Sequence, residues 1–208
     1  MSIIDQPAQQ PKCILEPMDL QEQAQADELL RQRKICGWSD TPEQIANWKA
    51  AIDRKAKSLF WIKRTSQPDL CIGHISLDSE AHPPDLELAD PINKSVLTIN
   101  TLFILPEHRG GGIGRAAIEA LEKVATVEPY GSRNCKTVAL TTLSRRYGED
   151  DEWRGVYEKL VGVEAPKRGK ANEDWYTRMG YVKWKDEGLW DGPDGYKFIG
   201  AFLRKRIA

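Results

Sequence analysis

Residues 102–114 read Leu102-Phe103-Ile104-Leu105-Pro106-Glu107-His108-Arg109-Gly110-Gly111-Gly112-Ile113-Gly114. The apolar start predicts a strand, and the proline that follows marks its end. The glycines have no side chains, so their backbone can approach a ligand closely. A helix is expected directly after them, because small and apolar residues recur at positions 113, 116, 117, 120, 121 and 124. The segment therefore predicts a strand, a glycine turn and a helix in succession.

A turn of this kind is suited to bind an anion. The first amides of a helix have no partner within the helix, and the helix dipole places partial positive charge at the same end. Three phosphate-binding patterns compete for it. A P-loop requires lysine and then serine or threonine after its last glycine, whereas Gly114 is followed by Arg115 and Ala116. This difference excludes the P-loop.

A dinucleotide-binding fold is the second pattern. Residues 112–117 can serve as its glycine fingerprint, but it also requires an acidic residue at the end of the next strand. That strand ends in Thr141, Thr142 and Leu143, none of which is acidic. A nicotinamide-dependent oxidoreductase is therefore the more distant alternative.

The third pattern is arginine or glutamine, two residues, glycine, one residue, and then glycine or alanine. Arg109, Gly112 and Gly114 match it, with Pro106 three residues before the arginine. Residues 102–114 thus resemble the acetyl-CoA signature of the Gcn5-related N-acetyltransferases, the GNAT superfamily. The resemblance implies that the amides of residues 109–115, including those of Arg109, Gly110, Gly111, Gly112, Ile113, Gly114 and Arg115, grip the pyrophosphate. It also implies that the main chain of Phe103, Ile104 and Leu105 pairs with the pantetheine arm, and that the Ile104 amide stabilises the oxyanion.

The resemblance implies a second landmark, a tyrosine four residues before a glycine and an aromatic residue. Tyr176 stands at this spacing from Gly180 and Tyr181, whereas Tyr157 has one residue too many before its glycine. We therefore assign the site tyrosine to Tyr176, whose phenol is expected to protonate the departing thiolate. Asn172 is expected to cap the short helix that carries Tyr176 and to lie at the coenzyme site.

The general base departs from the family pattern. Many relatives have glutamate where this sequence has Thr101, with Asn100 beside it, and neither side chain is a useful base. The open alternatives are a water held by Thr101 or Asn100, His74 on the preceding strand, or a loop carboxylate. The carboxylate candidates are Asp78, Glu80 and Glu87. The acceptor pocket is expected from the loops at residues 35–41 and 184–196 and the excursion 143–171, with Trp38, Trp184 and Trp190 as candidate walls.

Composition limits the remaining possibilities. The chain has 208 residues with 30 basic and 31 acidic side chains, so no overall charge attracts nucleic acid or a membrane surface. Four scattered cysteines lack the spacing of a metal site, and the polar N-terminus lacks the apolar core of a secretory signal. We expect a cytoplasmic protein with one domain over residues 1–208, a flexible arm at 1–11, and no metal.

The pattern along the chain predicts an α/β (α+β) fold with a mixed, mostly antiparallel sheet. Six to seven strands, flanked by helices and splayed at the central strands, are expected. The strands are placed at residues 12–16, 58–64, 70–77, 96–105, 136–142, 181–184 and 196–203. Helices are placed at residues 19–34, from Thr41 to near Lys57, from Ile113, at 153–160 and from Asn172 to Gly180.

These observations together predict an N-acetyltransferase. Acetyl-CoA would be the co-substrate, and a primary amine of a small molecule, peptide or protein would attack it directly in a ternary complex. Cys36, Cys71 and Cys135 are not where the motif would place a nucleophile, which argues against an acyl-enzyme. The alternative from another class is a coenzyme A-binding sensor or scaffold without turnover, motivated by the missing glutamate. Dimers are frequent in the family, so a homodimer is expected.

Overall fold

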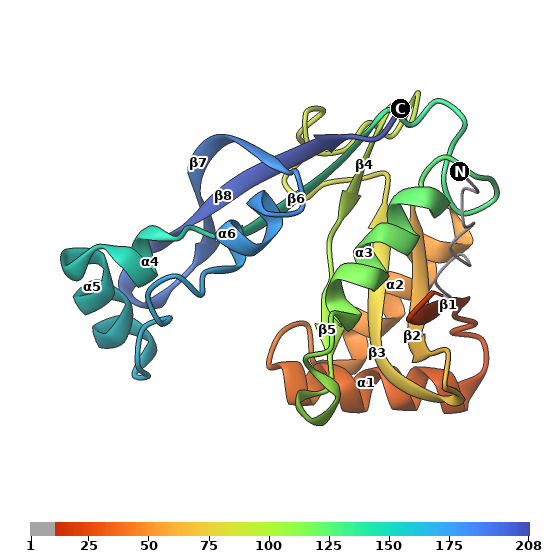
Figure 1. The fold of residues 1–208 in the computed structure, drawn as a ribbon, viewed down its shortest axis with the longest axis horizontal. Helices are drawn as coiled ribbons and strands as arrows, with labels where there is room; N and C mark the ends of the chain where they lie inside the picture. Colours follow the sequence, from red (N-terminus) through yellow and green to blue (C-terminus); the bar gives the residue numbers. More distant parts are fainter. Residues whose placement is uncertain (1–10) are drawn as a thin grey trace, which may run out of the picture.

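The computed structural model describes residues 11–208, so nearly all of the predicted arm at 1–11 lies outside the described residues. Eight strands join into one sheet (Figure 1). They are β1 (Cys13–Pro17), β2 (Lys57–Arg64), β3 (Gln67–Asp78), β4 (Val96–Ile99), β5 (Leu102–Ile104), β6 (Thr137–Leu143), β7 (Val182–Asp191) and β8 (Lys197–Arg206). The spatial order is β1-β2-β3-β4-β6-β8-β7, and β5 pairs with β3 next to β4.

The pairing confirms a mixed, mostly antiparallel sheet. In the described part of the chain only β4 and β6 run parallel to each other. The sheet has one strand more than expected, because the predicted strand 96–105 is broken at Asn100 and Thr101. Its first half, β4, pairs with β6 on one side and with the end of β3 on the other, whereas its second half, β5, pairs with β3 alone. The pairing with β6 thus stops within two residues, and this is the expected splay of the central strands.

Six α-helices flank this sheet in the described chain. They are α1 (Gln23–Cys36), α2 (Pro42–Asp53), α3 (Ile113–Val124), α4 (Arg146–Glu149), α5 (Asp151–Val161) and α6 (Asn172–Thr177). The predicted start of α2 is confirmed, because Thr41 Oγ1 accepts a hydrogen bond from the amide of Gln44 at 3.3 Å. The helix ends at Asp53 rather than near Lys57, since Lys55 has a φ of 59° and turns the chain into β2.

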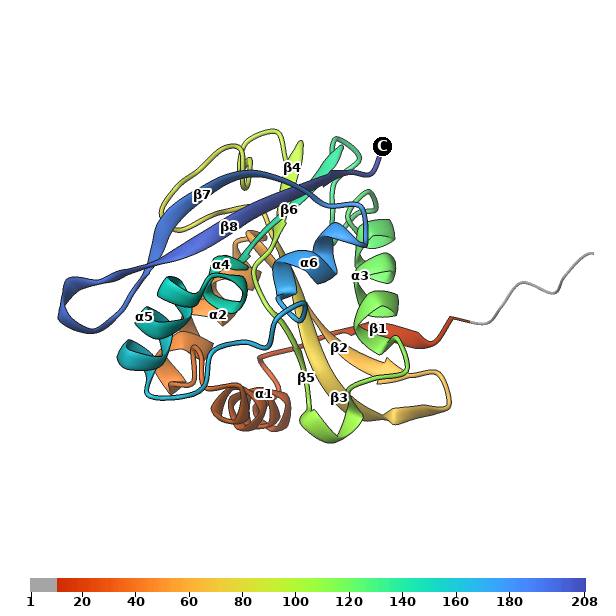
Figure 2. The same ribbon diagram turned by 60° about the vertical axis from the view of Figure 1, so that its left-hand side comes forward.

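Alternate residues of β2 show which helices cover which face of the sheet. Leu59 and Trp61 pack with α1 and α2, whereas Phe60 and Ile62 pack in the core beneath α3. Figure 2 shows α3 on the face of the sheet opposite α1 and α2. Both faces of β2 are therefore buried, and the N-terminal ends of α2 and α3 lie on different sides of the sheet.

The excursion at residues 143–171 contains α4 and α5, where only one short helix was expected. Its acidic and basic runs bind each other. Arg168 donates hydrogen bonds to the Glu149 carbonyl and to Asp151, and the Gly169 amide donates to Glu149 Oε1 at 2.6 Å. These charges thus hold the excursion together. Across residues 11–208, no helix has the length and apolarity needed to cross a bilayer.

Candidate active site

The glycine turn between β5 and α3 has a backbone that glycine alone adopts easily. Gly110, Gly111 and Gly112 have φ values of 94°, 60° and 79°, in the left-handed region that side chains disfavour. Within residues 11–208 no hydrogen bond engages the amides of these glycines, nor those of Gly114 and Arg115. Several donors at the start of α3 are therefore free, whereas the amides of Arg109 and Ile113 donate to the carbonyls of Pro106 and Gly110.

Two basic side chains from other strands lie beside this turn. Lys12 Nζ donates to the Gly111 carbonyl at 3.1 Å, and Arg64 donates to the His108 carbonyl at 2.9 Å. Neither residue belongs to the sequence motif, so their approach could not be read from it. They add positive charge next to the free amides.

The main chain of β5 presents only one of its predicted residues to the open edge. The Leu105 amide donates to the Ile72 carbonyl at 2.9 Å, and Phe103 is paired with His74 of β3. Alternate residues of a strand direct their main-chain N–H and C=O groups to opposite edges of the strand, so those of Ile104 point away from β3. Its carbonyl accepts a hydrogen bond from Arg109 Nε at 3.0 Å. Of the predicted pantetheine partners, Ile104 alone offers main-chain groups there, while Phe103 and Leu105 are bound to β3.

The close contact between β3 and β5 requires a glycine in β3. A side chain at Gly73 would place its Cβ 2.2 Å from the Phe103 carbonyl oxygen. Gly73 therefore lets β5 approach β3, and so fixes the position of Ile104.

The tyrosine assigned to the site lies on α6, beside the glycine turn. The Trp175 ring packs over Gly114, and the Ile104 side chain lies against the same point. Tyr176 follows Trp175 and is buried, with its ring centroid 4.8 Å from that of Trp175. Burial raises the pKa of Tyr176, so its phenol keeps its proton. Tyr157 lies on α5 and packs instead against Tyr147 and Phe198.

Asn172 does not cap α6, which corrects the prediction. It is the first helical residue and is exposed, and the cap position is occupied by Ala171. Glu173, rather than a capping side chain, anchors this helix to the rest of the protein. It is buried, accepts a hydrogen bond from the Arg145 amide at 2.7 Å, and forms an ion pair with Lys183 at 3.0 Å.

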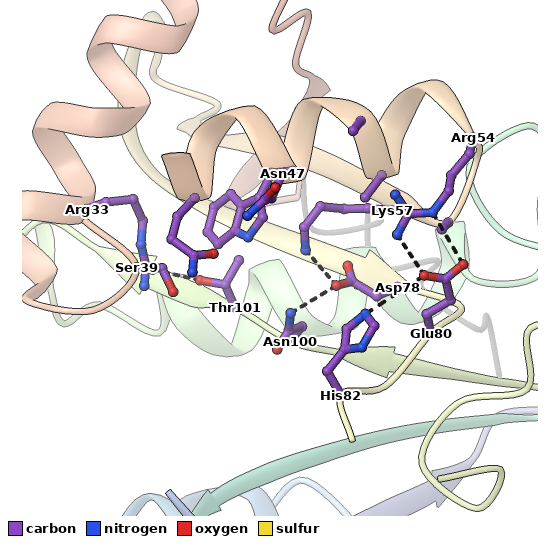
Figure 3. Close-up of a pocket in the computed structure, with 15 residues that line it drawn as sticks. Arg33, Ser39, Asn47, Arg54, Lys57, Asp78, Glu80, His82, Asn100 and Thr101 are labelled. Atoms are coloured by element: carbon purple, nitrogen blue, oxygen red, sulfur yellow. Dashed lines mark hydrogen bonds and ion pairs between the residues drawn. The ribbon is translucent and has the colours of Figure 1, made fainter. Parts of the chain in front are cut away.

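A cavity of about 550 Å³ opens beside the break between β4 and β5 (Figure 3). Asn100 and Thr101 line it together with residues of α1, α2 and the end of β3. A smaller cavity of about 120 Å³ shares Glu80, His82 and Asn100 with it and continues to Trp190. The two residues at the strand break thus face a space large enough for a small acceptor.

Two ion pairs lie in the wall of the larger cavity. Lys57 Nζ and Asp78 Oδ2 are 2.5 Å apart and both are buried, whereas the Arg54–Glu80 pair, at 2.8 Å, is more exposed. Asn100 Nδ2 also donates to Asp78 Oδ2, at 3.0 Å. Asp78 Oδ1 is buried and has no hydrogen-bond partner among residues 11–208. One carboxylate oxygen in this wall is therefore without a hydrogen-bond donor in the described chain.

The surroundings of His74 do not suit a general base. It is fully buried, and burial together with the charges of Arg33 and Lys57 lowers its pKa to about 3. Its Nδ1 pairs with Gln32 Oε1 at 2.9 Å, which leaves Nε2 as the acceptor for Arg33 Nη1 at 3.3 Å. Both ring nitrogens are engaged, so His74 does not fit the role of base. Glu87 lines neither cavity and lies 3.6 Å from Arg204.

Of the three candidate tryptophans, Trp190 alone lines a cavity, the smaller one. The ring of Trp38, in the loop after α1, lies 6.4 Å from that of Trp190, on β7, in an edge-to-face arrangement. Trp184 packs against Phe202, and neither it nor Trp38 lines a cavity. Of the segments expected to form the acceptor pocket, residues 35–41 contribute Ser39 and residues 184–196 contribute Leu189 and Trp190, whereas residues 143–171 line neither cavity.

The cysteines and the metal-binding side chains of the described chain are placed as follows. None of the cysteines lines either cavity, and burial raises the pKa of the Cys13, Cys71 and Cys135 thiols. From residue 11 onward, no three His, Cys, Asp or Glu side chains gather in a group that could hold a metal ion.

The fold and the site define a class of enzyme in which a diphosphate-bearing coenzyme lies along a splayed sheet beside an acceptor cavity. The family model described as the acetyltransferase (GNAT) family matches residues 24–162, and the chain belongs to this family. It is an acetyl-CoA-dependent N-acetyltransferase, which confirms the resemblance in residues 102–114.

Solved structures share the fold at low sequence identity. An aminoglycoside 6'-N-acetyltransferase complexed with coenzyme A has a TM-score of 0.61 at 14% identity, covering 94% of this chain and 97% of that one. A dodecameric spermidine N-acetyltransferase from Vibrio cholerae has a TM-score of 0.57 at 13% identity, with 94% of each chain covered. An acetyltransferase from Thermus thermophilus has a TM-score of 0.54 at 13% identity, covering 94% and 97%. No curated protein matches the sequence.

Proposed function

We propose that this chain transfers the acetyl group of acetyl-CoA to a primary amine held in the cavity beside Asn100 and Thr101. The observation that carries the proposal is the set of free amides at the start of α3, next to the open edge of β5. Residues 109–115 bind the pyrophosphate, with Lys12 and Arg64 adding charge. Ile104 holds the pantetheine arm through its main chain, and Asn172 lies at the coenzyme's edge.

The attacking amine has to lose a proton first, because an alkyl ammonium has no free electron pair. We assign the proton acceptor to Asp78, whose Oδ1 has no partner among the described residues. Asn100 fixes this carboxylate through its hydrogen bond to Oδ2, and Thr101 fixes Arg33. Among the open alternatives for the base, this assignment chooses the carboxylate of Asp78 over a water held by Asn100 or Thr101.

The remaining steps use Ile104 and Tyr176. The nitrogen attacks the thioester carbonyl carbon, and the Ile104 amide stabilises the resulting oxyanion. The carbon–sulfur bond then breaks, and Tyr176 gives its proton to the thiolate sulfur. The proton released by the new amide nitrogen restores the phenol, and the proton taken up by Asp78 passes to water in the cavity.

A thiol-release assay with purified protein, acetyl-CoA and a panel of amines tests the proposal. Spermidine and an aminoglycoside belong in the panel, because two structural neighbours are named for these substrates. We expect amine-dependent release of coenzyme A and an acetylated product by mass spectrometry. Calorimetric binding of acetyl-CoA without release for any amine would instead identify a sensor or scaffold. Light scattering in the same samples measures whether the predicted homodimer forms.

A further inference from the structure

Arg33 of α1 is a buried cation that has only neutral partners. Its side chain reaches the cavity from the end of α1 (Figure 3), and the residue is 5% exposed. Nε donates to the Trp38 carbonyl at 2.7 Å, and Nη1 donates to Thr101 Oγ1 at 2.9 Å. Nη1 also lies 3.3 Å from His74 Nε2. Within residues 11–208, no carboxylate forms an ion pair with this guanidinium.

A buried cation without an ion-pair partner is stabilised when an anion binds beside it. Burial lowers the pKa of Arg33, which reflects the cost of removing its charge from water. Nη2 makes no hydrogen bond to any residue of the described chain, although the guanidinium group has five N–H donors. The free donors belong to a side chain that lines the cavity. An anionic group of a bound molecule can therefore meet them.

The surroundings fix the guanidinium without neutralising it. His74 is neutral, and its Nδ1 contact with Gln32 directs Nε2 toward Arg33. The guanidinium also stacks over the Trp48 ring at 5.3 Å. The two free N–H groups of Nη2 are thereby held in a fixed direction for the oxygen of an anion.

The other charges of the cavity wall are already matched. Lys57 pairs with Asp78 and Arg54 pairs with Glu80, whereas Arg33 forms no ion pair among residues 11–208. The carboxylate of Asp40 attracts Arg33 electrostatically but forms no hydrogen bond with it. The wall therefore presents free donors to an anion beside the carboxylate of Asp78, whose Oδ1 is buried without a partner in the described chain.

We infer that the acceptor of this enzyme carries a carboxylate in addition to its amine, and that Arg33 binds the carboxylate. This inference rests on the proposed acetyl transfer to an amine in the cavity. It makes amino acids or short peptides the favoured class, and it disfavours polycations such as spermidine, which would meet an unpaired positive charge.

Matched amines test the inference. Each amino acid is compared with its carboxamide, and lysine with cadaverine, which is the same side chain and amine without the carboxylate. Dipeptides separate a free amino acid from a peptide terminus as the source of the group. We expect at least one acid to have a kcat/KM roughly 10- to 150-fold above its uncharged analogue, the range for hydrogen bonds to a charged group.

Arg33→Gln should remove this preference while leaving the Kd for acetyl-CoA unchanged. Lys34→Gln is the matched control, since it removes one positive charge from the exposed side of the same helix. If Arg33 were only structural, Arg33→Gln would lower kcat/KM equally for the acid and its amide. That result, or a preference for amides or polyamines in the unaltered enzyme, overturns the inference.

Binding measurements keep the two proposals distinguishable. The acids and their amides are also titrated calorimetrically into the protein saturated with coenzyme A. Arg33-dependent binding of an acid without acetyl transfer would refute the proposed function and support the inference. If no acid binds more tightly than its amide, the inference is wrong even where an amine is acetylated.

Discussion

Tyr176 is a single side chain whose role can be separated from its packing. Tyr176→Phe keeps the ring between Trp175 and Tyr181 but removes the proton that the thiolate needs. We expect kcat to fall about 100-fold, within the range for loss of a general acid. The Kd for acetyl-CoA, measured by calorimetry, should stay unchanged. Tyr157→Phe on α5 is the control, and full activity in Tyr176→Phe would rule out the assigned role.

Asp78 has a structural partner, so its removal needs a compensating change. Asp78→Asn leaves the buried Lys57 ammonium without a counterion, and we expect the free energy of unfolding to fall by about 3–5 kcal/mol. The double variant Asp78→Asn/Lys57→Met should recover most of this loss in urea denaturation. Its turnover should stay low, because no proton acceptor has returned. Recovery of both stability and turnover would show that Asp78 is structural only.

Among the elements, the turn before α3 carries the proposed coenzyme site. Gly112 has a φ of 79°, and Gly37 at the end of α1 has a φ of 78°. Alanine at either position should cost about 1–2 kcal/mol of stability, because both backbones are left-handed. Only Gly112→Ala should also weaken acetyl-CoA binding, since its methyl group stands beside the free amides. Equal calorimetric Kd values for the two variants would exclude these amides as the pyrophosphate site.

The sequence predicted the elements whose signals are local. The stripe of α3, the Thr41 cap of α2 and the glycine turn all depend on neighbouring residues, and all are present. The splay of the central strands was expected from the family resemblance, but the break at Asn100 and Thr101 was not placed, because both halves of residues 96–105 have apolar strand composition. It arises where the pairing with β6 stops and that with β3 continues, which only the assembled sheet determines.

The coenzyme side of the site was more predictable than the acceptor side. Its turn is continuous in sequence, whereas Arg33, Lys57 and Asp78 come from separate elements. One feature of the sequence could have pointed to the burial of Arg33. It lies four residues after the buried Leu29 on α1, so a charged side chain falls on a buried face. Nothing in the sequence places Lys57 beside Asp78.

At the scale of the whole molecule, His74 links acid stability to the buried network. Its pKa is about 3 in the folded protein and near 6.5 when the chain unfolds. Between these values the unfolded chain binds a proton that the folded protein does not. The stabilisation is therefore complete above about pH 6.5 and is lost as the pH falls toward 3. From pH 7 to pH 5, the free energy of unfolding should decrease by about 2 kcal/mol from this group alone.

Urea denaturation at pH 7, 6 and 5 checks this expectation. His74→Gln can still accept a hydrogen bond from Arg33 but cannot bind the proton, so its stability should fall less steeply with pH. The charged side chains that depress the pKa of His74, Arg33 and Lys57, are unchanged in this variant. Parallel pH profiles for the two proteins would contradict the assignment.

The two residues at the strand break have a mechanical consequence. Asn100 holds Asp78, Thr101 holds Arg33, and the same two residues connect β4, which pairs with β6, to β5, which does not. If the part of the sheet that contains β6 moves relative to the part that contains β3, the chain has to bend at these two residues. Because the proposed coenzyme and acceptor sites both adjoin them, we expect a ligand in either site to restrict this bending.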